Sequence, residues 1–82
     1  MKNIEKVNQI CKRHLNVDFL KDAELRKKHF FSKEVGASVR ELVLVLLEIE
    51  KELEYTFSDE YLKSGGFGSF DMIVDYMGLE NK

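Results

Sequence analysis

Cysteine and histidine, the usual side-chain ligands of zinc, are few in this chain. Cys11 and His14 stand three residues apart, a spacing that two metal ligands can use on one helix. A tetrahedral site needs further ligands, and the sequence offers no matching second pair. Cys11 also falls on an apolar stripe. We therefore predict that Cys11 is a small thiol of the core and that no metal is bound.

Enzymatic catalysis finds equally little support. Neither His14 nor His29 has an evident serine or cysteine partner, so a catalytic triad is not indicated. Two pairs of carboxylates are explained more simply by helix starts and solvation than by acid–base chemistry: Asp59 with Glu60, and Asp71 with Asp75. The glycine-rich stretch 65–68 follows a predicted helix and not a strand, which indicates helix termination rather than a phosphate-binding loop. We expect a protein that is not an enzyme.

The charge balance argues against a nucleic-acid-binding protein. The net charge is −2 and the sequence pI is about 5.7, whereas dedicated nucleic-acid-binding domains usually carry a basic excess. Phe30 and Phe31 follow the basic run 26–29, and aromatic side chains beside basic ones can stack on bases, but we predict core packing for both. The acidic stretch 48–60 forms either a solvated surface or a contact with basic partner proteins.

Length and composition predict one small domain over residues 1–82. Cys11 is the only cysteine, so an internal disulfide is impossible. The first fifteen residues mix charges with apolar side chains, which does not resemble a signal peptide, and no apolar run is long enough to span a membrane. We expect a cytoplasmic, monomeric protein that binds no membrane.

Ser38 opens the clearest local pattern in the sequence. Residues 38–41 read Ser-Val-Arg-Glu, a capping box in which Ser38 and Glu41 satisfy each other's backbone N–H groups, and this predicts a helix over residues 38–54. One broad apolar face of that helix is predicted to contain Val39, Leu42, Val43, Leu46, Ile49 and Leu53. Leu44 and Leu47 fall outside this face. The helix is therefore either buried all round or exposes an apolar patch to a partner.

The other elements are also predicted to be helical. A first helix covers residues 3–15 with Asn3 as its N-cap, a short helix begins at Ser58 and ends at glycines 65–66, and a last helix runs from Ser69 to Gly78. Residues 16–37 form a long connection that lays aromatic side chains on the core, with a short helical piece over residues 22–28. The predicted fold is an all-α, small four-helix bundle with a long first loop and a short third helix.

This layout resembles the acyl carrier proteins. Residues 36–39 (Gly-Ala-Ser-Val) resemble the family's glycine-containing turn into the serine that opens its second helix, and residues 42–53 (LVLVLLEIEKEL) resemble its apolar helix with an acidic "LEEEF"-like end. Residues 57–60 look like its "IPDE" turn with serine in place of proline, and residues 69–77 look like its final helix. The likeness covers residues 35–77 well and the first third by pattern only. Residues 38–54 also look like the carrier-related proteins found with bacterial peptide-maturation genes.

The resemblance implies a prosthetic group and a set of partners. A 4′-phosphopantetheine arm would be attached to Ser38 through a phosphodiester, and its terminal thiol would carry an acyl or aminoacyl group as a thioester. The phosphate would then lie at a helix N-terminus, where free amides and the helix dipole favour negative charge. A phosphopantetheinyl transferase and acyl- or peptide-modifying enzymes are the implied partners. Their contacts are expected on the second helix, at Val39, Arg40, Leu44, Leu47 and Glu48.

The attachment motif departs from the family pattern. The family usually has Asp-Ser-Leu, whereas this chain has Ala37-Ser38-Val39. An alignment without gaps puts Val39 at the position of the modified serine, and only a shift of one residue restores Ser38 to it. Arg40 adds positive charge where the family is usually acidic. Ser38 is therefore either an N-cap alone or an N-cap that also carries the arm.

Three functions follow from these alternatives. The first is a thioester carrier modified on Ser38. The second is a carrier-shaped protein-interaction module without a prosthetic group, acting in a peptide-modification or biosynthetic pathway. The third is a helical dimerisation domain that uses Leu44 and Leu47.

Overall fold

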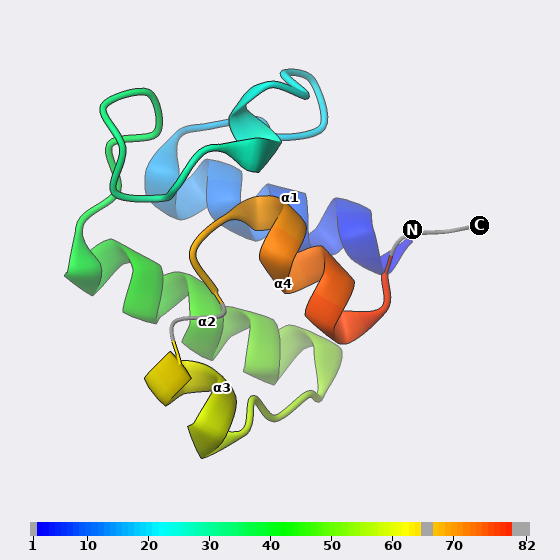
Figure 1. Ribbon diagram of the computed structural model, residues 1–82. Coiled ribbons are helices and arrows are strands. Elements are labelled where there is room, and N and C mark those ends of the chain that lie inside the picture. The colour runs from blue at the N-terminus through cyan, green and yellow to red at the C-terminus, as the bar shows by residue number, and fades with distance from the viewer. Residues whose placement is uncertain (1, 65–66, 80–82) are drawn as a thin grey trace.

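Four α-helices and one short 3-10 helix make up the computed structural model, which describes residues 2–64 and 67–79. The α-helices are α1 (Asn3–Leu15), α2 (Val39–Leu53), α3 (Asp59–Ser64) and α4 (Phe70–Met77), and the 3-10 helix η1 is Leu25–Lys27 (Figure 1). No strand occurs in these two described ranges. The radius of gyration of 11.5 Å is close to the roughly 12 Å expected for a folded domain of this length. The predicted all-α class is confirmed.

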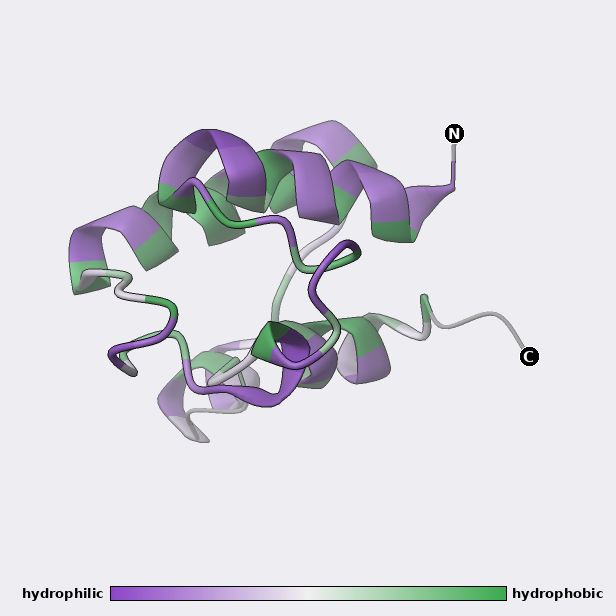
Figure 2. Cartoon of the chain, turned by 90° about the horizontal axis from the view of Figure 1, so that it is seen from above, coloured by the Kyte–Doolittle hydropathy of each residue, from purple (hydrophilic) through white to green (hydrophobic). Residues whose placement is uncertain are grey.

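The two long helices pack against each other and the shorter ones complete the core. α1 packs on α2, and α4 packs on η1 in the long connection. Figure 2 shows hydrophilic stretches along the outer sides of the long helices and hydrophobic stretches turned towards the interior. This is the arrangement of a small helical bundle, in which each amphipathic helix buries one stripe against its neighbours.

Serine side chains begin three of the helices, as predicted: Ser38 for α2, Ser58 for α3 and Ser69 for α4. Each hydroxyl oxygen accepts a hydrogen bond from the backbone N–H three residues later, with N···O distances of 3.1–3.2 Å. Gly78 ends α4 in the left-handed conformation with φ 67°. The prediction that glycines 65–66 end α3 lies outside the described residues.

The start of α1 differs from the prediction by one residue. Asn3 is the first residue of the helix and Lys2 is its N-cap, so the prediction of Asn3 as N-cap is wrong. The Glu5 carboxylate accepts a hydrogen bond from the Lys2 backbone N–H at 2.9 Å. A carboxylate in the first turn thus satisfies the terminal amide, and no cap side chain is required for it.

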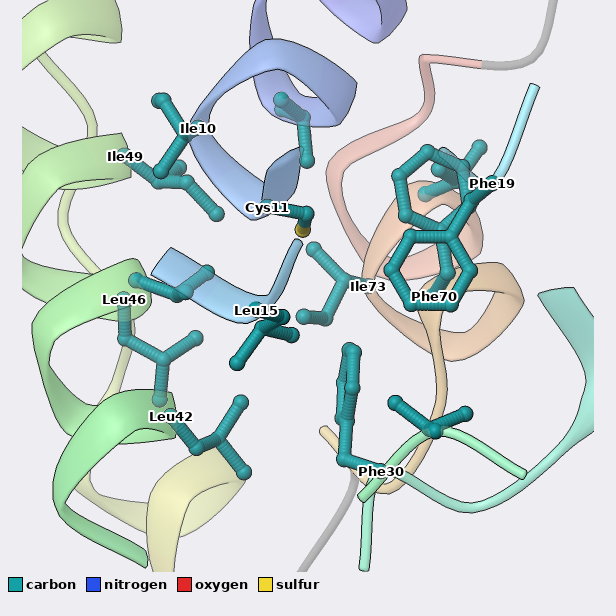
Figure 3. Packing of buried hydrophobic residues seen from close by; sticks show 14 of the residues in the cluster. Ile10, Cys11, Leu15, Phe19, Phe30, Leu42, Leu46, Ile49, Phe70 and Ile73 are labelled. Carbon is teal, nitrogen blue, oxygen red and sulfur yellow. The ribbon is translucent and has the colours of Figure 1, made fainter. Parts of the chain in front are cut away.

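The long connection delivers two of the largest core side chains. Phe19 and Phe30 are both fully buried, and the Phe19 ring stacks on Phe70 of α4 with ring centroids 4.9 Å apart (Figure 3). The buried Asn8 side chain of α1 holds this segment, because its Oδ1 accepts from the Phe19 N–H at 2.7 Å. The prediction that residues 16–37 lay aromatics on the core is confirmed. The helical piece is shorter than predicted and is confined to η1.

Two predictions about core residues have opposite outcomes. Phe31 is 47% exposed, so the prediction that it packs in the core with Phe30 is wrong. The two residues are adjacent, and the chain turns at Phe30, whose N–H bonds to the Gly68 carbonyl at 2.8 Å. Cys11 is fully buried as predicted, and burial raises the pKa of its thiol to about 12.

The buried face of α2 is rotated from the predicted one. Leu42, Leu46 and Ile49 are buried as expected, but Val39 and Val43 are 67% and 47% exposed. Their place in the core is taken by Val45, which is fully buried. The reason is that α1 packs on the Val45 side of α2, while the Val39 and Val43 side is left without a long helix against it.

Candidate functional site

Ser38 stands at the exposed opening of α2. Its backbone N–H donates to Glu41 Oε1 at 2.9 Å, and its Oγ accepts from the Glu41 N–H at 3.2 Å, which completes the predicted capping box. The residue is exposed, as are its neighbours Val39 and Arg40. The hydroxyl thus combines two properties: it holds the first turn of the helix and it is open to reagents from the solvent.

The turn before Ser38 is fixed by backbone contacts with distant segments. Gly36 has φ 70°, a left-handed conformation that glycine adopts without strain. The next N–H, from Ala37, donates to the Phe30 carbonyl at 2.9 Å. The Phe30 N–H in turn donates to the Gly68 carbonyl at 2.8 Å, so the end of the connection is tied to the loop before α4. These bonds hold Ser38 in one position relative to the core.

An apolar groove begins beside Ser38 and follows α2. Its volume is about 380 Å³, and it is lined by Phe31, Val39, Leu42, Val43, Leu46, Leu47, Glu50, Phe57, Leu62 and Phe67. Leu42, Leu46 and Phe57 are buried and form its inner wall, whereas Val39, Val43 and Leu47 are exposed along one edge. Spacings of four residues place these last three on one side of the helix. Figure 3 shows Leu42 and Leu46 projecting from α2 into the core.

The one acidic residue of the groove does not open it to polar ligands. Glu50 uses its Oε2 to accept the Phe57 N–H at 2.9 Å, so this oxygen is directed to the backbone before α3. The remaining lining side chains are aliphatic or aromatic. A groove with this lining has the chemistry to hold an apolar chain or apolar side chains.

The predicted partner-binding residues fall into two groups. Leu44 and Leu47 are 44% and 56% exposed on the outer side of α2, which confirms that they lie outside the buried face. Glu48 lies on a different side, between α2 and α1. Its carboxylate contacts Arg13 Nη2 at 2.7 Å and His14 Nε2 at 2.5 Å. The hydrogen bond from His14 is the main cause that lowers the pKa of Glu48.

Sequence reasoning missed most of the groove. Phe31, Leu62 and Phe67 come from three separate segments, and nothing in their local patterns indicates that they meet beside α2. Val43 was placed in the core instead. A signal was present for the edge of the groove, because Val39, Val43 and Leu47 repeat every four residues and so share one side of the helix.

The residues around Ser38 fit a phosphopantetheine arm. An exposed hydroxyl is present, the helix N-terminus favours a phosphate, and the guanidinium group of Arg40 adds positive charge in the first turn. The Glu41 carboxylate, bonded to the Ser38 N–H, opposes a phosphate by charge repulsion. The hydroxyl, the helix terminus and Arg40 would hold the group, and its thiol would supply the thioester.

Comparison with protein-family models, with curated proteins and with solved structures gives no match to this chain. Within residues 2–64 and 67–79, no group of three or more His, Cys, Asp or Glu side chains could hold a metal ion. Cys11 and His14 do not belong to such a group in that part of the chain. None of the helices described is both long and apolar enough to cross a membrane.

Proposed function

We propose that this protein is a carrier of the acyl-carrier type, which holds an acyl or aminoacyl group as a phosphopantetheine thioester on Ser38 and presents it to partner enzymes. One observation supports the proposal above the others. The exposed Ser38 hydroxyl lies at the first turn of α2, and the next residue, Val39, already lines the apolar groove. The attachment point and a shelter for apolar cargo are thus adjacent in the chain.

The protein's own residues would do three things in this role. The α2 N-terminus would bind the phosphate of the arm through its amides and dipole. The capping box would keep the attachment point in a fixed place, since Ser38 and Glu41 are bonded in both directions. The groove would exclude water from an apolar acyl chain, with a buried wall formed by Leu42, Leu46 and Phe57. Catalysis would be left to the transferase and to the acyl- or peptide-modifying enzymes.

Intact mass measurement tests the attachment. The unmodified protein is incubated with coenzyme A and with several phosphopantetheinyl transferases, including one from the native host. We expect a mass gain of one phosphopantetheine group, located on the peptide that contains Ser38. Ser38→Asn removes the hydroxyl but keeps an N-cap side chain, so the fold persists and the mass gain disappears. Ser58→Asn is the matched control at the start of α3 and retains the gain. If the wild-type protein stays unmodified with every transferase tested, the proposal is contradicted.

A second function is favoured by a specific observation. In the alignment without gaps, Val39 and not Ser38 takes the place of the modified serine, and Glu41 places a carboxylate beside the hydroxyl. The protein would then be a carrier-shaped interaction module without an arm, recruiting a modifying enzyme through α2 and its groove. Full biological activity of Ser38→Asn in the native host would support this function, and loss of activity with an intact fold would support the carrier.

A further inference from the structure

The outer side of α2 carries an apolar pair with a cation at each end. Arg40, Leu44, Leu47 and Lys51 follow one another at spacings of four, three and four residues. These spacings place them in one row along the helix, over roughly 16 Å from first to last. All four side chains are exposed. We call this row the outer stripe.

The acidic side chains of α2 are engaged elsewhere. Glu48 and Glu52 both contact Arg13 of α1, at 2.7 Å and 3.1 Å. Glu41 bonds to the Ser38 N–H, and Glu50 bonds to the Phe57 N–H. Each of these four carboxylates therefore has a partner within the molecule, and none of these partners is Arg40 or Lys51.

The two cations of the outer stripe have no such partners among the described residues. Neither Arg40 nor Lys51 forms an ion pair with any residue in the described ranges 2–64 and 67–79. Their charges therefore point to the solvent beside Leu44 and Leu47, whereas Glu48 is turned towards α1. The outer stripe therefore carries an exposed cation at each end of its leucine pair.

A second copy of this chain does not satisfy the outer stripe. If two copies pack antiparallel along α2, Arg40 of one lies opposite Lys51 of the other. If they pack parallel, each cation lies opposite itself. Both arrangements bring like charges together while burying the leucines, which opposes association. The row therefore fits a different molecule, with an apolar centre and negative ends.

We propose that the outer stripe docks an amphipathic helix of a partner protein that places apolar side chains against Leu44 and Leu47 and carboxylates against Arg40 and Lys51. Helices pack along their side-chain rows, and opposite charges at the ends set register and orientation. The inference rests on the proposed function for the identity of the partner, which would be an enzyme that handles the carrier. The sequence of the acidic stretch 48–60 left a contact with basic partner proteins open, whereas the cations of the outer stripe favour a partner with acidic side chains.

Three synthetic helical peptides provide the probe. Each has about 16 residues, enough for a helix when it is cross-linked on its far side, and each carries the same leucine row. They differ only at the two ends of that row, which bear glutamate, glutamine or lysine. Affinity for the full chain is measured by titration calorimetry at about 50 mM and about 500 mM salt. We expect the glutamate peptide to bind about tenfold more tightly than the lysine peptide at low salt, and the difference to shrink at high salt.

Variants of the protein locate the effect. Arg40→Glu with Lys51→Glu should invert the order of the three peptides. Lys27→Glu with Lys28→Glu changes the net charge by the same amount on the exposed connection and should leave the order unchanged. Leu44→Ala with Leu47→Ala should weaken the binding of all three peptides to the protein. Ser38→Asn should bind like the wild type, so this test and the test of modification can fail separately.

Four results would overturn the inference. The first is that no peptide binds at about 1 mM, and the second is that the affinity does not depend on the end residues of the peptide. The third is that Lys27→Glu with Lys28→Glu changes the order of the peptides as much as Arg40→Glu with Lys51→Glu does. The fourth is that the protein sediments as a dimer, which Leu44→Ala with Leu47→Ala dissociates. Binding to vesicles of phosphatidylcholine and phosphatidylserine in equal parts, lost on reversal of Arg40 and Lys51, would assign the stripe to a lipid surface instead.

Discussion

Both sides of α2 carry apolar residues, but only one of them has a long helix packed on it. On the side that faces α1, Val45 and Ile49 are fully buried, and the ion pair between Arg13 and Glu48 closes the edge of the contact. On the opposite side, Val39 and Val43 remain exposed along a groove of about 380 Å³. Apolar residues alone therefore do not determine which side of a helix becomes core.

Truncating a buried leucine and an exposed leucine of α2 gives the largest difference in stability. Leu42 is 2% exposed and Leu47 is 56% exposed. Leu42→Ala should lower the free energy of unfolding by about 2–5 kcal/mol, because it removes buried methyl groups and leaves a cavity. Leu47→Ala should lower it by less than about 0.5 kcal/mol, because the side chain is already in water. Urea unfolding monitored by circular dichroism measures both values. Equal losses would mean that Leu47 is covered in the folded protein.

Substitution of the N-cap residue of α2 has an intermediate effect on the free energy of unfolding. Ser38→Ala should lower the free energy of unfolding by about 1 kcal/mol, because the Glu41 N–H loses its acceptor. Ser38→Asn should cost only a few tenths of a kcal/mol, since asparagine is an equally good N-cap. The same urea experiment separates them. If alanine and asparagine behave alike, the hydroxyl does not cap the helix in solution.

Removal of a charge at the polar edge between α1 and α2 has the smallest effect on the free energy of unfolding, and this effect depends on pH. The pKa of Glu48 is lowered from its ordinary value of 4.5, chiefly by the hydrogen bond from His14. A carboxyl with a lowered folded-state pKa stabilises the protein above its unfolded pKa, and this stabilisation is lost as pH falls through the folded pKa. Glu48→Gln should therefore cost less than about 1 kcal/mol at neutral pH, with a smaller difference from wild type below about pH 4.

Thermal unfolding between neutral and acidic pH checks this prediction. Glu34→Gln is the matched control, because Glu34 is exposed on the connection, away from the contact between α1 and α2. A Glu48→Gln difference that grows on acidification would contradict the assignment.

Local patterns were enough to predict the helices. The three serine caps lie where short-range sequence signals placed them, since the N-cap bond joins residues only three apart. The rotation of α2 could not be predicted in the same way. Val43 and Val45 are equally apolar, and the choice between them depends on where α1 packs, which is a contact between distant parts of the chain.

The same distinction applies to the candidate site. The sequence placed Ser38 at the start of a helix and Leu44 and Leu47 outside its main apolar face, but it left open whether the two leucines are covered, and the structure shows them exposed. The groove could not be predicted, because its walls come from the connection, from α3 and from the segment before α4. The contacts of Glu48 with α1 were also hidden from the sequence, since they join residues 34 and 35 positions apart.

The burial of Cys11 makes its thiol unreactive towards reagents while the protein is folded. With its pKa at about 12, the thiol is protonated at neutral pH and enclosed by the core, and it is the only cysteine in the chain. Thiol-directed alkylating reagents react with thiolates, so labelling of Cys11 must wait for the core to open. Any sulfhydryl that reacts promptly in the folded protein would then come from a prosthetic arm, and the slow labelling of Cys11 would time the opening of the fold.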